Sequence, residues 1–243
     1  MSSITKTTGN QRSRFFIVMA MFFAFVAIAG FAKTFFLPLM QDTFKAAPIF
    51  FVHGGFFFAW VFLFAVQVFL IRFKNPSLHR KLGVLAMVIA VGMVVSCIGV
   101  GISALHRDLA LGLGQIARSS LLGVFTGMLI FSSLFIAGIM YRRRSDYHKR
   151  LMFLATVFVL WPAWFRFRHY FPDVPRPEIV FGFVFADIPI IIAMIYDKLT
   201  IKRVHPVYLY VGTVLIIENF VEVMIFDSPP WQIAANWLAG FFI

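Results

Sequence analysis

The chain has 243 residues, of which 61% are hydrophobic and 13% are charged, and its mean hydropathy is +0.89. A soluble domain carries about 25% charged residues, so this composition excludes an ordinary soluble protein and predicts a multi-pass membrane protein. The formal net charge of +12 does not indicate nucleic-acid binding, because the basic residues stand in short groups between apolar segments.

Residues 1–14 are polar and are predicted to form a cytoplasmic tail. The apolar run that follows is longer than the core of about 7–15 residues found in a cleavable signal peptide, so we expect a retained signal-anchor. Apolar runs of roughly 17–25 residues are long enough to cross a bilayer. They predict seven membrane helices in one transmembrane domain, residues 15–226: Phe15–Pro38, Ile49–Ile71, Leu82–Leu105, Ser119–Met140, Leu151–Tyr170, Ile179–Tyr196 and Val207–Ile225.

The fifth predicted helix is the least regular, because Pro162 removes one backbone hydrogen bond within it. Residues 227–243 follow the seventh helix and are predicted to form a short helix in the membrane interface. Ser228 is the expected N-cap of this helix, and Trp231 and Trp237 are its expected interfacial anchors. The fold class is therefore an all-α, seven-helix membrane bundle with a C-terminal interfacial helix.

The distribution of basic residues predicts the orientation of the bundle. Most of the 22 Lys and Arg residues lie in the N-terminal tail and in the second, fourth and sixth loops. Such loops are typically cytoplasmic, so we expect a cytoplasmic N-terminus and a C-terminus on the outer side.

The six histidines sort by side in this topology. His79, His148 and His205 fall at the cytoplasmic starts of the third, fifth and seventh helices, and His53, His106 and His169 fall at or near outer helix ends. Two interpretations of the cytoplasmic three stay open. They are part of the basic groups that flank membrane helices, with Ser77 and Ser145 as helix N-caps, or they are ligands or proton-handling groups, since neutral histidine is a poor topology signal.

His53 lies about five residues inside a predicted span and is followed by Gly54 and Gly55. A histidine within a span usually faces a cavity, a ligand or a partner helix rather than lipid, and the glycines leave room for close approach of a macrocycle or another helix. The candidate cofactor-binding residues are His53, His79, His148 and His169.

Several ionisable residues stand where the membrane makes them costly. Asp187 lies near the middle of the sixth helix, so it should be protonated, paired or in contact with water. Glu218 and Glu222 lie four residues apart on one helix face, where like charges repel unless a basic group intervenes. The candidate partners on the same side are Lys33, Arg118, Arg166 and Arg168, and Asp187, Glu218, Glu222, Arg166 and Arg168 are the candidate proton-handling residues. A polar pocket that opens outward is predicted from the residues of the outer half: Lys33, His53, His106, Arg166, Arg168, His169, Glu218 and Glu222.

Common catalytic and metal-binding motifs are absent from the sequence. It contains no HExxH, HxxxH, CxxC, GKS/T or GxSxG motif. The single cysteine, Cys97, excludes an intramolecular disulfide and a thiolate cluster. No catalytic residue is therefore assigned, and the sequence favours a non-enzymatic role.

Three motifs resemble a broad group of bacterial inner-membrane proteins with six or seven helices. They are His53-Gly54, the run Leu78-His79-Arg80-Lys81-Leu82-Gly83 and the run His148-Lys149-Arg150-Leu151-Met152, within a region from Val52 to Gly212. The resemblance implies location in a bacterial inner membrane and carries little function. The chain also resembles, more distantly, cytochrome b561-type bundles, which hold haem b between histidines of different helices. That resemblance implies His53 as an axial ligand, with His79 and His148 as inner ligands.

Three functions follow as expectations. The first is a non-catalytic accessory subunit of a larger respiratory or photosynthetic membrane complex, favoured by a phenylalanine-rich exterior, and its partners are lipid and other membrane proteins rather than nucleic acid. The second is a protein that binds haem b or a metal, with Arg166 and Arg168 outside, or Arg80 and Lys149 inside, neutralising the propionates. The third is a proton-coupled transporter that uses Asp187, Glu218 and Glu222.

Overall fold

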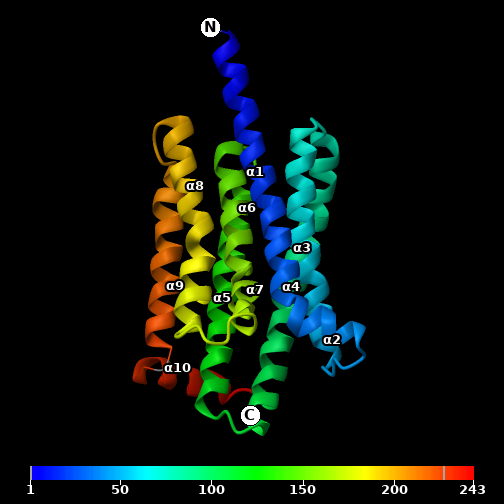
Figure 1. The fold of residues 1–243 in the computed structure, drawn as a ribbon, viewed down its shortest axis with the longest axis vertical. Coiled ribbons are helices and arrows are strands. Elements are labelled where there is room, and N and C mark those ends of the chain that lie inside the picture. The colour runs from blue at the N-terminus through cyan, green and yellow to red at the C-terminus, as the bar shows by residue number, and fades with distance from the viewer. Residues whose placement is uncertain (1, 227) are drawn as a thin grey trace.

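The computed structural model describes residues 2–226 and 228–243, with side chains from Arg14 onward. Seven helical segments are long and apolar enough to cross a membrane, as the sequence predicts. They run up and down beside one another in one bundle (Figure 1). The side chains of the predicted tail before Arg14, and position 227, lie outside the described residues. The spans are Arg14–Met40, Pro48–Arg72, Pro76–Ala110, Gln115–Met140, Ser145–His169, Glu178–Ile201 and Val207–Ile225.

Four spans are divided into more than one helical element. The first span comprises α1 (Ser2–Phe31), the π-helix η1 (Ala32–Phe36) and α2 (Leu37–Met40). The second, third and fourth spans are single helices: α3 (Pro48–Arg72), α4 (Pro76–Ala110) and α5 (Gln115–Met140). The fifth span comprises α6 (Ser145–Val159), α7 (Trp161–Phe165) and the 3₁₀-helix η2 (Arg166–His169), the sixth comprises the π-helix η3 (Glu178–Phe185) and α8 (Ala186–Ile201), and the seventh comprises the π-helix η4 (Val207–Gly212) and α9 (Thr213–Ile225). The break before α7 confirms the predicted irregularity at Pro162, which occupies the first turn of α7.

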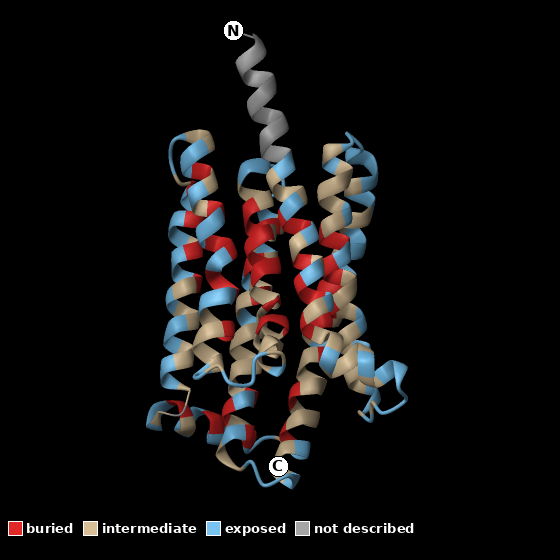
Figure 2. Ribbon diagram, viewed as in Figure 1, coloured by how far each residue is buried: buried red, intermediate tan, exposed pale blue. Residues whose placement is uncertain are grey.

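The fifth span is the centre of the bundle. It is the most buried of the seven, and α6 lies in the middle of Figure 2, where buried residues concentrate. Phe153 of α6 is fully buried and contacts Phe23 of α1 and Tyr208 of η4, with ring centroids 5.3 and 5.7 Å apart. Side chains on the outer faces are large and apolar. A lipid environment accounts for this pattern, because hydrocarbon does not penalise exposed apolar surface.

The helix α10 (Pro229–Ala239) runs across the end of the bundle that carries α2, below α9 in Figure 1, and packs against α5. Ser228 is its N-cap residue, as predicted, although its side chain makes no capping hydrogen bond. Trp231 is buried and its indole Nε1 donates to the Ser119 carbonyl at 3.4 Å. Trp231 therefore packs on protein rather than anchoring in the interface, while Trp237 is exposed as expected.

Two predicted N-caps are wrong. The side chain of Asn75 caps α4, accepting a hydrogen bond from the Leu78 amide at 3.1 Å, because α4 begins at Pro76, before Ser77. Ser145 is the first residue of α6, and the N-cap residue is Arg144, which provides no capping side chain. Both helices begin before the predicted apolar spans, so His79 lies in the first turn of α4 and His148 in the first turn of α6.

Candidate functional site

Two of the predicted ligands, His79 and His148, lie side by side at the end of the bundle nearest the N-terminus. Each is the fourth residue of its helix, His79 in α4 and His148 in α6. The centroids of the two imidazole rings are 6.3 Å apart, and the rings are nearly perpendicular. Residues 69 positions apart in the sequence are thus brought together, and we call them the histidine pair.

The hydrogen bonding of His148 identifies its tautomer. Its Nδ1 lies 2.8 Å from the Gly138 carbonyl oxygen. A carbonyl only accepts hydrogen bonds, so Nδ1 carries the proton and, in the neutral ring, Nε2 carries a lone pair. A Cβ atom at Gly138 would lie 2.0 Å from the methyl carbon of Met152, the far end of a flexible side chain that would have to move. A backbone carbonyl that orients Nδ1–H is the arrangement common to histidines whose Nε2 binds a metal.

His79 has a buried ring nitrogen without a partner. Gln67 of α3 donates from Nε2 to the His79 carbonyl oxygen at 3.2 Å. The Nδ1 atom of His79 and the Oε1 atom of Gln67 are both buried and make no hydrogen bond with the described residues. Buried polar atoms are nearly always satisfied, and leaving one unsatisfied costs about 1–3 kcal/mol. An ordered water or a bound ligand can satisfy such an atom.

His205, the third histidine of the predicted inner set, uses both ring nitrogens within the protein. Its Nδ1 accepts from the Val207 amide at 3.2 Å, so its Nε2 carries the proton and donates to Asp146 Oδ2 at 3.3 Å. Burial and the Arg150 guanidinium lower the pKa of His205, although Asp146 and Asp197 act in the opposite direction. Its backbone amide also donates to Asp197 Oδ2 at 3.3 Å. His205 therefore fixes the start of η4 and has no lone pair for a metal.

The sequence analysis missed a buried ion pair beside these histidines. Arg150 of α6 donates to both carboxylate oxygens of Asp197 of α8, from Nε at 2.9 Å and from Nη2 at 2.6 Å. Each side chain is only 4% exposed. In the sequence, Arg150 stands in the basic run that starts at His148, and no pattern points to a role for Asp197. The one sequence signal was an acidic residue at the end of an apolar run, which does not identify a partner 47 positions away.

His53 lies apart from the histidine pair, in the half of the bundle nearer α2. Its Nδ1 is 3.0 Å from the Ser96 hydroxyl, which donates its single hydrogen to the Gly92 carbonyl at 2.6 Å. Nδ1 of His53 is therefore the donor in this contact, and in the neutral ring Nε2 keeps a lone pair. A Cβ atom at Gly54 or at Gly55 would meet nothing within 4 Å, so the packing of the described residues does not require a glycine at either position.

Three other predicted site residues, Arg166, Arg168 and His169, form hydrogen bonds at the end of the fifth span. Arg166 donates to the Pro162 carbonyl at 2.8 Å and to the Thr34 hydroxyl at 3.2 Å, and Arg168 donates to the Phe165 carbonyl at 3.0 Å. The carbonyl of His169 accepts from Lys33 Nζ at 3.1 Å, and the His169 side chain is exposed. These contacts close the irregular helix end and join it to η1.

The predicted basic partners of the helix-seven carboxylates do not pair with them. Among the described side chains, neither Glu218 nor Glu222 forms an ion pair. Instead Glu222 accepts from the Thr126 hydroxyl at 3.1 Å and interacts directly with Glu218. The buried Asp187 accepts from Asn219 Nδ2 at 3.0 Å. The result is a carboxylate cluster between α5, α8 and α9, without a cation.

The predicted outer pocket is therefore divided. His53 binds Ser96, the carboxylates bind Asn219 and Thr126, and His106 lies at the far end of α4, where its Nε2 contacts the Phe242 carbonyl at 2.6 Å. Within the described residues, no group of three or more His, Cys, Asp or Glu side chains is arranged to hold a metal ion.

Comparisons of the chain with protein-family models, curated proteins and solved structures gave no match.

Proposed function

We propose that the protein binds a transition-metal centre through His79 and His148 and serves in electron transfer within the membrane. The observation that carries this proposal is the pairing of two imidazoles from different helices, one oriented through Nδ1 and the other with a buried, unpartnered Nδ1. Imidazole is a common ligand for iron, copper, nickel and zinc. Structural histidines would satisfy both polar edges within the protein, as His205 does.

The separation of the rings suits one metal ion between them. Imidazole nitrogens bind a metal at about 2.0–2.1 Å, so two nitrogens on opposite sides of one ion lie about 4 Å apart. A ring-centroid distance of 6.3 Å accommodates that spacing.

The number of donors favours haem iron over a bare ion. A protein zinc site normally uses three or four protein ligands, and no third His, Cys, Asp or Glu joins the pair among the described residues. Haem b carries its own porphyrin ligands, so His79 and His148 would be the protein residues that hold it. Bound haem supplies reversible one-electron transfer. Arg80 and Lys149 each follow a histidine of the pair directly, and they are the residues proposed to neutralise propionates.

The test is the absorption spectrum and metal content of protein purified in mild detergent. We expect a Soret band and bound iron in the wild type, and loss of both in His79→Ala and His148→Ala. His148→Asn is the sharper variant, because an amide nitrogen can still donate to the Gly138 carbonyl while Nε2 is gone. The matched control is His106→Ala at the opposite end of the bundle, which should keep the cofactor. A band that survives in both His148 variants would overturn the assignment, and metal without a Soret band would identify a bare ion as the ligand.

A second candidate is proton movement through the carboxylate cluster. Three carboxylates, Asp187, Glu218 and Glu222, lie within spans and have no cationic partner among the described side chains. Intramembrane carboxylates of this kind are typical of proton relays. In proteoliposomes, Glu222→Gln should abolish pH-driven uptake or proton flux if this function is right, and Glu178→Gln, outside the cluster, should not. Equal flux in both variants would exclude it.

The accessory-subunit expectation is compatible with either function. Its sequence support was the apolar exterior, and lipid covers such a surface as well as a partner protein does. The histidine pair gives the more specific proposal, because its chemistry predicts a measurable cofactor.

A further inference from the structure

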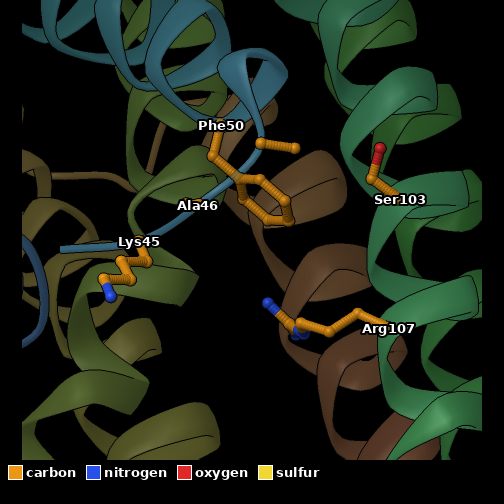
Figure 3. Close-up of a pocket in the computed structure, with 6 residues that line it drawn as sticks. Lys45, Ala46, Phe50, Ser103 and Arg107 are labelled. Atoms are coloured by element: carbon orange, nitrogen blue, oxygen red, sulfur yellow. The ribbon is translucent and has the colours of Figure 1, made fainter.

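A cavity of about 470 Å³ opens at the end of the bundle opposite the histidine pair. It lies between the loop that precedes α3, the first turn of α3 and the last turns of α4 (Figure 3). The lining residues are Lys45, Ala46, Ala47, Phe50, Ser103 and Arg107. Two basic residues and a serine therefore line it, and no acidic residue does.

Both charged residues that line the cavity are basic. Arg107 donates from Nε to Asp108 Oδ1 at 2.7 Å, and this contact leaves the two terminal Nη groups of the guanidinium for other partners. The guanidinium lies 5.5 Å from the centroid of the Phe50 ring, which supports it from one side. Lys45 adds a second cation from the loop (Figure 3). Asp42, in the same loop, is exposed and does not line the cavity.

The length of α4 places the cavity at the depth of lipid headgroups. The helix has 35 residues and is about 52 Å long at 1.5 Å per residue, whereas the hydrocarbon core is only about 30 Å thick. Its apolar stretch ends at Leu105, and the polar residues His106, Arg107 and Asp108 follow. Arg107 therefore lies just beyond the hydrocarbon, where the phosphate groups of a leaflet are found.

We propose that this cavity binds the phosphate group of an anionic phospholipid. The Nη groups of Arg107 match two phosphate oxygens, Lys45 adds a point charge, and the Ser103 hydroxyl donates a further hydrogen bond. Phe50 and the two alanines give an apolar wall for the glycerol and upper acyl chain. Basic cavities between membrane helices at this depth are suited to lipid headgroups. The site is independent of the metal centre proposed at the other end.

The test measures lipid binding to the purified full chain by native mass spectrometry, after exchange into detergent containing phosphatidylglycerol or phosphatidylcholine. We expect a preference for phosphatidylglycerol, an affinity lowered about fivefold in Lys45→Gln and in Arg107→Gln, and lowered about thirtyfold in the double variant. These changes correspond to about 1 kcal/mol per basic side chain near a charged headgroup.

Arg118→Gln is the matched control, since it removes one charge near the same end of the bundle without touching the cavity. It should retain wild-type lipid binding. Inorganic phosphate added in excess distinguishes the two sources of the ligand. Displacement of the lipid by millimolar phosphate would support an anion-binding site in the cavity and would identify free phosphate as its ligand. Equal lipid binding by the wild type and the folded double variant, judged by its unfolding temperature, would overturn the proposal.

Discussion

The guanidinium of Arg150 and the carboxylate of Asp197 form a two-point ion pair that joins α6 to α8, with both side chains 4% exposed. Nη1 of Arg150 also donates to the Asp146 carbonyl at 2.9 Å, and Asp197 accepts from the His205 amide. One buried pair thereby fixes the first turn of α6, which carries His148, to the helix that precedes His205. We regard it as the structural support of the histidine pair.

Removing one partner of this ion pair should destabilise the protein strongly. Asp197→Asn leaves the Arg150 charge buried without its counter-ion, and breaking a buried pair in this way costs about 3–5 kcal/mol. The apolar double variant Arg150→Met with Asp197→Leu should recover most of that loss. Unfolding free energies from detergent titration with sodium dodecyl sulfate would measure both changes.

The exposed pair between Arg176 and Glu178 provides the control for that experiment. Glu178→Gln should change the free energy of unfolding by no more than about 1 kcal/mol, because solvent already screens the charges. If Asp197→Asn is equally mild, the buried pair does not join the helices as described.

Stability should fall as the medium becomes acidic, because of His205. Burial lowers the pKa of His205 below its ordinary value of 6.5, so the folded state binds a proton less readily than the unfolded state. Its contribution to stability is present above pH 6.5 and is lost progressively as the pH falls below that value toward the folded-state pKa. The unfolding temperature of the wild type should therefore drop between pH 7 and pH 5.

His205→Gln isolates the contribution of this group. Glutamine places a neutral amide near the position of Nε2 and can still donate to Asp146, so the pH-dependent part of the drop should shrink while the protein stays folded. An identical pH profile in the variant and the wild type would show that other groups control acid stability.

The close approach of α1 to α7 depends on Gly30. A Cβ atom at this position would lie 2.3 Å from the Ala163 carbonyl oxygen, a backbone atom that cannot rotate away. Gly30→Ala should therefore separate the two helices at a cost of about 1–3 kcal/mol. The comparison variant is Gly54→Ala, whose Cβ meets nothing within 4 Å. Thermal unfolding should show a loss for the first and no loss for the second; equal values would contradict the packing at Gly30.

The spans could be predicted from the sequence because a bilayer demands long apolar helices, which leave a strong one-dimensional signal. Pro162 likewise marked the break in the fifth span. The helix starts were less accurate, since α4 and α6 each begin several residues before the apolar run that defined them. Because α4 begins at Pro76, its N-cap residue is Asn75 and not the predicted Ser77.

The site was only partly predictable. Loop charges placed His79 and His148 on the same side, but their adjacency depends on how α4 and α6 are rotated and packed, which no local pattern encodes. The same holds for Arg150 with Asp197. His205 shares the histidine-and-basic-residue pattern of the other two, yet its hydrogen bonds give it a different role. Tautomers depend on three-dimensional neighbours.

The central claim is that the histidine pair holds one metal centre in each chain. The most direct measurement is the iron content of wild-type protein purified in mild detergent, combined with its reduced-minus-oxidised absorption spectrum. The account predicts one iron per chain and the sharp bands of a haem with two histidine ligands. A colourless preparation without bound metal, from protein that is folded and was expressed with an ample haem supply, would contradict it.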